Sequence, residues 1–348
     1  MKDKILGIAL RIIAVILAFS LLTLLFMPKY IEKNTDGRIM PEFYREKTAI
    51  DVDFIGSSTV QAGISPMTLY REYGITSYDR SNSSQVMALS YYVAEDTIKR
   101  NKPKLIVLDV GFIYQSFDFV DEGASRKSLD GMRWSKSKSE AIKAMMDDTE
   151  HYIDYVFPIL RFHSRWNDLS LEDIKYLVYK PTVTNNGQLL KFESRGSEYD
   201  YNPYMLESSI LACSENMEYL QRLTYLCKEN DVELLLIKMP LVSGNWSREI
   251  DNQISSFAAE NGIIYKNFID DFDAIGLVQE TDFSDSQHMN VYGAEKFTKV
   301  LGKYIIENYG IRDRRDDQNI EKAFKEKLDR YEYAIEHQIP TEMSDDSK

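Results

Sequence analysis

Apolar runs of strand length alternate with amphipathic segments along most of the chain. Apolar residues alternate with Asp51 and Asp53 at 50–55, are nearly continuous at 105–110 and 232–237, and form two shorter runs at 75–78 and 263–265. A run that is apolar at nearly every position is typical of a strand covered on both faces. Segments with helical spacing follow the runs, at 66–73, 86–100, 206–230, 248–261 and 291–308. The pattern therefore predicts a three-layer α/β/α fold with a mostly parallel sheet.

The N-terminus carries a different pattern. Residues 5–27 are almost continuously apolar, with Arg11 as the interruption, and are long enough to cross a bilayer core of roughly 30 Å. Lys2, Lys4 and Arg11 place positive charge at the start of this span, which favours a cytoplasmic N-terminus. We therefore expect one transmembrane helix in the cell membrane, with the remaining chain outside. A cleaved signal peptide is the alternative.

These patterns divide the chain. We expect an anchor at 1–28, a polar juxtamembrane linker at 29–48 and a catalytic domain at 49–310. Residues 111–205 break the strand–helix rhythm and are interpreted as an insertion or lid within that domain. The remainder, 311–348, is a charged and partly helical tail.

Composition excludes several classes of function. The 348 residues carry a formal net charge of −13, whereas a nucleic-acid partner requires a basic surface, so no nucleic acid is expected. The two cysteines, Cys213 and Cys227, fall fourteen positions apart in one helical segment, too far apart for a disulfide. We expect free thiols, and with four histidines and no CxxC motif we expect no metal or cofactor.

Two short segments hold the residue types of nucleophilic acyl transfer. Ser58 follows the predicted strand 50–55 within Gly56-Ser57-Ser58, and Asp285 and His288 precede the helical segment 291–308. A serine attacks a carbonyl, a histidine takes its proton and an aspartate orients the imidazole. Active residues of parallel sheets gather at the carboxyl ends of strands, so distant segments can form a single site.

Alternatives remain at each of these positions. Ser57 is a second candidate nucleophile, and Asp282 is a second candidate partner for the histidine. Ser58 is also suited to capping a helix. In the insertion, His163, Arg165 and Trp166 form an aromatic and basic cluster, which is a candidate for substrate binding or for simple packing of the lid.

The segments 56–58, 82–85 and 285–290 together resemble the SGNH (GDSL-like) hydrolase superfamily. The chain is most similar to its membrane-anchored bacterial members, the DltD-like and polysaccharide O-acyltransferase types. The resemblance implies a flavodoxin-like sheet, Ser58 as the nucleophile, and His288 and Asp285 as base and orienting acid.

The chain also departs from that family. Ser57 stands where the family has aspartate, and Asn82 and Ser83 stand where a glycine supports the oxyanion. Asn82 and Ser83 are therefore the candidates for oxyanion support, although Asn82 is equally suited to an ordinary turn. The family's G-x-N-D block has no match after 105–110, which leaves the second oxyanion donor unassigned.

From these observations we expect an extracytoplasmic serine esterase or acyltransferase. Its expected substrate is an O-acyl ester, by default O-acetyl, on a cell-envelope polysaccharide or teichoic-acid-like polymer. The resemblance also implies a multispanning membrane acyl exporter as a partner. The alternatives are a catalytically lapsed scaffold of the same fold and a DltD-like D-alanyl transfer protein.

Overall fold

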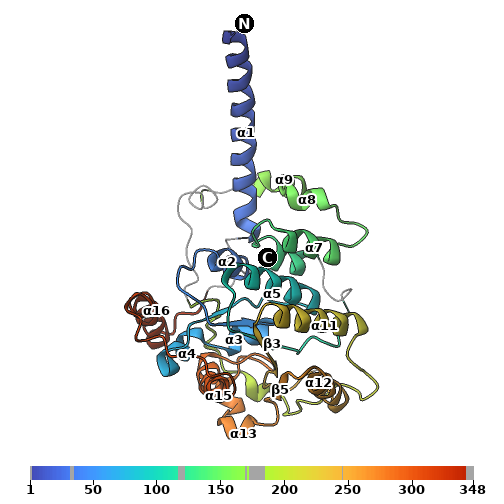
Figure 1. Ribbon diagram of the computed structural model, residues 1–348, viewed down its shortest axis with the longest axis vertical. Helices are drawn as coiled ribbons and strands as arrows, with labels where there is room; N and C mark the ends of the chain where they lie inside the picture. Colours follow the sequence, from blue (N-terminus) through green and yellow to red (C-terminus); the bar gives the residue numbers. More distant parts are fainter. Residues whose placement is uncertain are drawn as a thin grey trace.

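A parallel sheet forms the centre of the molecule. The structure is a computed structural model, and it describes residues 2–31, 35–116, 122–168, 171, 185–244 and 246–341. Neighbouring strands are parallel throughout the order β2-β1-β3-β4-β5 (Figure 1). They are β1 (Val52–Ile55), β2 (Ser77–Asp79), β3 (Leu105–Asp109), β4 (Glu233–Lys238) and β5 (Ile264–Asn267). This is the flavodoxin-like order, so the predicted fold is confirmed.

Helices cover both faces of the sheet because its strands are apolar on both sides. Ile106 and Leu108 of β3 face one hydrophobic core, and Leu105 and Val107 face the other. The first core is covered by α5 (Met87–Asn101), α7 (Lys136–Met145), α11 (Ser214–Glu229) and α12 (Arg248–Asn261). The second is covered by α3 (Ser58–Gly63), α4 (Pro66–Tyr73), α13 (Phe272–Ile275) and α15 (Val291–Tyr309).

Local sequence sets the helix ends. The Ser65 side chain accepts a hydrogen bond from the Thr68 N–H at 3.2 Å and so caps α4. That helix ends at Gly74, whose φ of 66° lies in the left-handed region that glycine tolerates. Asn290 caps α15 by accepting from the N–H groups of Tyr292 and Gly293. This cap fixes the chain two residues after His288.

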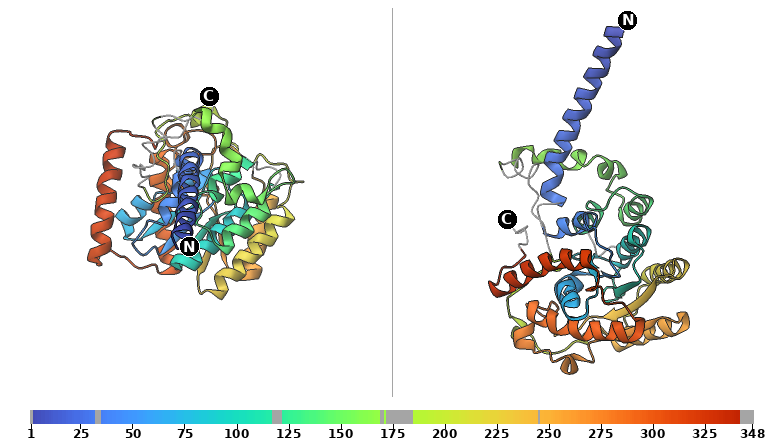
Figure 2. Two further views of the ribbon diagram at one scale, coloured as in Figure 1. Left: turned by 90° about the horizontal axis from the view of Figure 1, so that it is seen from above. Right: turned by 60° about the vertical axis from the view of Figure 1, so that its left-hand side comes forward.

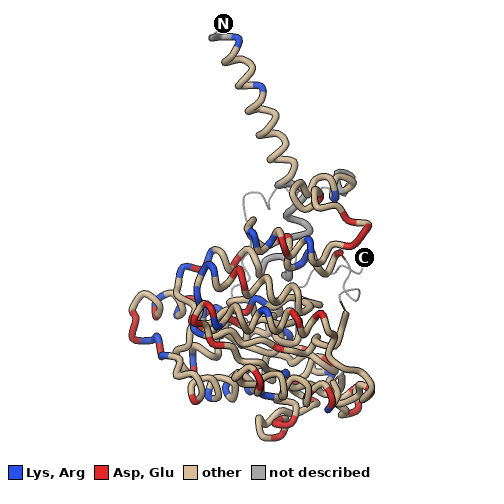
Figure 3. Tube along the Cα trace, turned by 45° about the vertical axis from the view of Figure 1, so that its right-hand side comes forward, with Lys and Arg blue, Asp and Glu red and all other residues tan. Residues whose placement is uncertain are grey.

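The N-terminal helix α1 (Lys2–Ile31) projects from the domain (Figures 1 and 2). Its candidate membrane span, Lys4–Thr23, has a mean hydropathy of 2.7 and none of it is buried. Positive charge lies near its start and the rest of the span is uncharged (Figure 3). The next helix, α2 (Thr35–Phe43), buries Ile39, Met40 and Phe43 against the domain. The segment expected as a polar linker thus contributes to the core.

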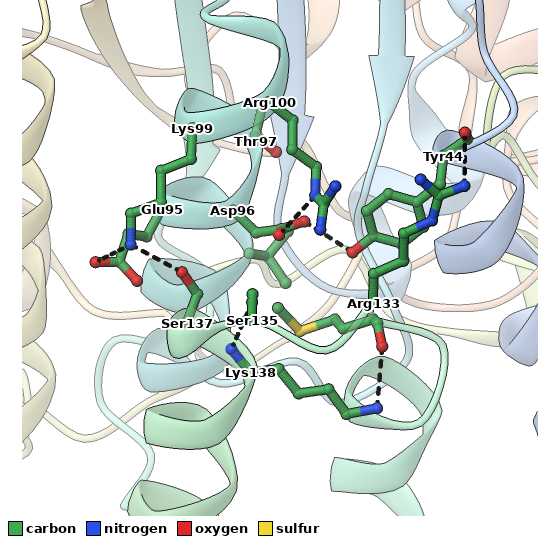
Figure 4. Close-up of polar contacts among 12 residues, drawn as sticks. Tyr44, Glu95, Asp96, Thr97, Lys99, Arg100, Arg133, Ser135, Ser137 and Lys138 are labelled. Carbon is green, nitrogen blue, oxygen red and sulfur yellow. Dashed lines mark hydrogen bonds and ion pairs between the residues drawn. The ribbon is translucent and has the colours of Figure 1, made fainter.

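A buried ionic cluster joins α2 to the sheet, and Figure 4 shows part of it. Arg80, fully buried after β2, donates to Asp96 at 3.2 Å and to Thr97 Oγ1 at 2.6 Å. The Tyr44 hydroxyl donates to Asp96 at 2.7 Å. The guanidinium carbon of Arg80 lies 4.0 Å from the centroid of the Phe43 ring. We call these five residues the Arg80 cluster.

The insertion splits into two parts with different neighbours. Its first part holds α6 (Glu122–Leu129), α7, α8 (Tyr152–Val156), α9 (Ile159–Phe162) and the 3-10 helix η2 (His163–Asp168). There α7 packs on α5, and α9 packs on α1 (Figure 1). The second part, from residue 185 through η3 (Gly196–Glu198), runs beside the C-terminal segments. The Leu189 N–H donates to the Gln61 oxygen at 2.8 Å, and the Arg195 N–H to the Phe283 oxygen at 2.9 Å.

Two further helices complete the domain. The short α14 (Gln279–Asp282) precedes the predicted Asp285/His288 segment. In the charged tail, α16 (Gln318–Glu336) lies against α4, where the Phe324 and Tyr70 rings stack with centroids 4.2 Å apart. The Ser65 hydroxyl donates to the Tyr331 oxygen at 3.1 Å. The helical part of the tail is therefore packed on the domain.

Candidate active site

A tight turn after β1 presents Ser58. Gly56 leaves the strand, and a Cβ at this position would lie 2.5 Å from Val60 Cγ2, so a larger residue would push the turn open. Ser57 is the N-cap of α3, and Ser58 is its first residue. The first N–H groups of a helix have no partner within the helix, so the Ser58 N–H is available at the carboxyl edge of the sheet.

His288 lies between Ser58 and Asp285. Its Nε2 is 2.7 Å from Ser58 Oγ, and its Nδ1 is 2.8 and 2.9 Å from the two carboxylate oxygens of Asp285. A small backbone loop sets this geometry, because the Ser284 N–H donates to the His288 oxygen at 2.9 Å. The structure thus brings together Ser58, His288 and Asp285, the three residues that the sequence predicted as catalytic.

Electrostatics keep the carboxylate of Asp285 ionised. Burial alone would raise its pKa, but its hydrogen bond and charge interaction with His288 hold the pKa well below the usual range. The backbone N–H groups of Gln287 and His288 each add a hydrogen bond to Oδ1, at 2.9 Å. Because an ionised carboxylate only accepts, Nδ1 carries the imidazole proton and Nε2 is left to accept from Ser58.

The alternative residues have other partners. Ser57 is buried, and its hydroxyl lies 3.0 Å from Thr59 Oγ1. Asp282 is buried, accepting from the Val278 N–H at 2.7 Å and pairing with Lys296 at 2.7 Å. Asp282 therefore ties α14 to α15, while Asp285 meets the histidine.

The loop after β2 passes close to the nucleophile turn. Asn82 is fully buried, and its N–H donates to the Gly56 oxygen at 3.4 Å. The Ser83 N–H donates to Asn82 Oδ1 at 3.2 Å, so Asn82 holds the loop in shape. Ser84 has a φ of 57° and lines a cavity together with Thr59. This geometry fits a supporting role for Asn82, and it places Ser84, which the sequence did not single out, in the wall of the same cavity as Thr59, the residue after the nucleophile.

The cluster predicted in the insertion lies in η2. This element packs against α9 and α1. His163 is exposed, with its Nδ1 2.9 Å from the Leu160 oxygen. The side chains of Arg165 and Trp166 lie outside the described residues. Substrate binding by this cluster stays a prediction.

Two cavities flank the triad. One, of about 200 Å³, is lined by Thr59, Gln287, Ser84 and Lys238 among others. Thr59 follows the nucleophile in the chain and Gln287 precedes the histidine, so the wall of this cavity includes a chain neighbour of each, although neither Ser58 nor His288 lines it. The other, of about 530 Å³, is lined by Asp285 and by Lys191, whose Nζ is 3.9 Å from Asp285 Oδ2. Asp285, the triad residue in its lining, contacts the ring nitrogen of His288 opposite Ser58.

Metal ligands are not grouped in the described ranges. No set of three or more His, Cys, Asp or Glu side chains there is placed to hold a metal ion. Both cysteines are free, as expected. The chemistry available at the site is that of the serine, the imidazole and the carboxylate.

Comparison with known proteins finds resemblance in structure only. No family model matches the chain, and no curated protein matches it. A protein described as lipolytic and of the G-D-S-L family, from Desulfitobacterium hafniense DCB-2, resembles it with TM-score 0.37 and 14% identity, over 72% of this chain and 97% of that one. A protein described as an acylhydrolase, from Bacteroides fragilis NCTC 9343, gives 0.38 and 9%, over 77% and 95%.

A third structure, described as a gut microbial diltiazem-metabolizing enzyme, gives a TM-score of 0.37 and 10% identity, over 76% of this chain and 48% of that one. Likenesses at this level carry no assignment of activity. We therefore base the function of this chain on its own side chains.

Proposed function

We propose that this chain is a membrane-anchored, extracytoplasmic serine esterase or acyltransferase. Its substrate would be an O-acyl ester, by default O-acetyl, of a cell-envelope glycan or teichoic-acid-like polymer. The observation that carries the chemistry is the continuous relay from Ser58 through His288 to Asp285, at 2.7 and 2.8 Å. The polymer, the acyl exporter partner and the transferase option rest on the sequence resemblance alone.

The relay supports a two-step mechanism. Ser58 Oγ attacks the ester carbonyl carbon while His288 Nε2 takes the hydroxyl proton. The Ser58 N–H is suited to stabilise the oxyanion, and His288 then returns the proton to the leaving alkoxide as the acyl-enzyme forms. In the second step His288 deprotonates water or an acceptor hydroxyl, which attacks the acyl carbon; the bond to Ser58 Oγ then breaks, and His288 returns the proton to that oxygen. Asp285 stabilises the imidazolium in both steps.

A fluorophosphonate probe tests the nucleophile. We expect the full-length protein to be labelled and the Ser58→Ala variant to remain unlabelled, with ester hydrolysis reduced by about 10⁴-fold or more. Ser57→Ala is the matched control, since it removes a neighbouring hydroxyl that points to Thr59, and it should still be labelled. Equal labelling of Ser58→Ala, or no labelling of the wild type, would reject the serine mechanism and favour a lapsed scaffold.

Anchoring in the membrane is supported by an apolar ledge beside α1. The ledge consists of Ile153, Phe157 and Leu160 on and around α8 and α9, which are 40 to 48% exposed. The Phe157 ring packs on Phe19, inside the candidate span, with centroids 5.9 Å apart. With α1 across the bilayer, this contact brings the ledge to the outer membrane surface, where exposed apolar side chains are favoured.

Reconstitution in vesicles with doxyl-labelled lipids tests this placement. Leu160→Trp should add tryptophan fluorescence that shallow doxyl groups quench. Tyr225→Trp is the matched control, because Tyr225 is exposed on α11, and its added fluorescence should not be quenched. Equal quenching of both variants would contradict the placement of the ledge. The intact mass of the membrane-bound protein separates an anchor from a cleaved signal peptide.

A further inference from the structure

A buried lysine lines the cavity that includes the chain neighbours of Ser58 and His288. Lys238 is the last residue of β4, and its side chain is 3% exposed. It lines the cavity of about 200 Å³ together with Thr59 and Gln287, the chain neighbours of the nucleophile and the histidine. A lysine side chain thus belongs to the wall of a small cavity whose lining also holds the residue after the nucleophile and the residue before the histidine.

Lys238 has hydrogen-bonding capacity to spare. An ammonium has three N–H donors, and within the described part of the chain its Nζ has one acceptor, the Met239 backbone oxygen at 3.3 Å. Leaving buried donors without acceptors costs free energy, because water no longer satisfies them. A ligand that supplies an acceptor would recover that cost.

Asp109 provides the charge that balances Lys238 but has its own partners. It ends β3, and its two oxygens accept from the Met239 N–H at 3.1 Å and the Thr59 hydroxyl at 3.3 Å. Burial raises the pKa of Asp109 and lowers that of Lys238, and their mutual attraction opposes both shifts. With Asp109 occupied by protein donors, the polar group that remains for a ligand is the ammonium.

The cavity also limits the size of the ligand. Its volume lies below the roughly 300 Å³ at which pockets for drug-sized molecules begin. A long fatty chain or a polymer segment does not fit such a space, whereas an acyl group of a few atoms does. The polymer side of the ester must therefore leave in another direction.

We propose that Lys238 determines acyl specificity by donating to an oxygen on a short acyl group while Ser58 attacks its carbonyl carbon. The favoured acyl groups carry a hydroxyl, carbonyl or carboxylate oxygen a few atoms beyond the ester carbonyl. This inference rests on the proposed serine mechanism, and it replaces the default acetyl group with a short acyl group that carries a further oxygen. Lys238 touches the acyl group and takes no part in the proton relay.

Hydrolysis of matched p-nitrophenyl esters tests the proposal. We expect wild-type kcat/KM for the 3-hydroxybutyryl or hemisuccinyl ester to exceed that for the butyryl ester by about 10-fold or more, the size expected for a hydrogen bond from a charged donor. Lys238→Met should bring this ratio close to one while fluorophosphonate labelling of Ser58 persists. Lys138→Met is the control, since Lys138 is equally buried but donates to Asp130 and Met132 oxygens in the insertion.

The outcomes separate the two proposals. A wild type that prefers the butyryl ester, or a Lys238→Met variant that keeps the wild-type ratio, overturns the role of Lys238 and leaves the serine mechanism standing. Absence of both hydrolysis and labelling in the wild type overturns the serine mechanism and this inference together. If Lys238→Met does not fold, Lys238→Gln is tested in its place, and the ratio of kcat/KM values for the two esters is again compared with that of the wild type.

Discussion

Two buried ionic centres lie near the carboxyl edge of the sheet, and their hydrogen bonds differ. In the Arg80 cluster, both terminal guanidinium nitrogens have acceptors, among them Asp96, Thr97 and the Tyr44 hydroxyl, while the buried Nε has none within the described part of the chain. In the Asp109–Lys238 centre, the carboxylate is satisfied by the protein, while the ammonium has donors to spare beside a cavity. Burial of charge is common to both. The cavity that Lys238 lines, and that no residue of the Arg80 cluster lines, distinguishes the candidate binding site from the structural centre.

Removing Arg80 should have the largest effect on stability. Arg80→Met would remove one of the two guanidinium groups that pair with the buried Asp96, the other being that of Arg100, and we expect the free energy of unfolding to fall by about 3 kcal/mol. Lys238→Met should cost less, because Asp109 keeps its hydrogen bonds from Met239 and Thr59. Urea unfolding of both variants measures the two losses. An equal or larger loss for Lys238→Met would remove the distinction between the two centres.

The pH dependence of stability should be dominated by carboxyl groups beside the Arg80 cluster. Burial raises the pKa of Asp53 to about 7, against the opposing charge of Arg80, and raises that of Asp79 to about 8. The folded protein therefore keeps protons that the unfolded chain releases near pH 4. The stabilisation is complete below about pH 4 and is lost as the pH rises through about 7 to 8, a change of a few kcal/mol.

Urea unfolding between about pH 5 and pH 8.5 tests this slope. Asp53→Asn and Asp79→Asn should each flatten it, since the amide does not titrate. Asp285 has a lowered pKa, so its contribution to the free energy of unfolding has the opposite pH dependence and is lost as the pH falls. That loss occurs below about pH 4, outside the pH range of this experiment. Stability that stays constant or rises between pH 5 and 8 would contradict the assignment.

The smallest effect should come from Tyr44→Phe. This change removes the hydroxyl that donates to Asp96 at 2.7 Å while keeping the ring that packs between α2 and the sheet. Because Arg80 and Arg100 still donate to Asp96, we expect a loss of about 1–2 kcal/mol. Thermal unfolding measures it, with Tyr225→Phe on the exposed face of α11 as the control. A loss as large as that of Arg80→Met would show that the hydroxyl, not the guanidinium, holds the cluster together.

The sequence predicted the regular part of the fold because its signals are local. The apolar run at 105–110 became β3, and helices stopped by glycine ended where expected, at Gly74 and Gly262. The segment 29–48 was harder, because Pro41 and its polar neighbours conceal the apolar face of α2. The burial of that face depends on the residues of the domain that pack against it, which the local sequence does not indicate.

The candidate site was predictable to the same extent. Ser58, Asp285 and His288 follow from residue type and position, and their approach follows from the shared edge of a parallel sheet. Lys238 gave no sequence signal, since a lysine that ends an apolar strand is ordinarily solvated. Lys191 and Gln287 likewise could not be predicted to line the cavities. The insertion brings Lys191 there, and the loop before α15 brings Gln287. Such positions depend on tertiary packing, which residue spacing does not encode.

The buried α2 has a consequence for where the enzyme can work. Between the end of α1 at Ile31 and the start of α2 at Thr35 lie three residues, which span at most roughly 14 Å when extended. With α1 in the bilayer and α2 fixed in the core, the domain has no long tether on which to swing. Under the proposed anchoring, the triad would therefore be held within a narrow range of heights above the membrane surface.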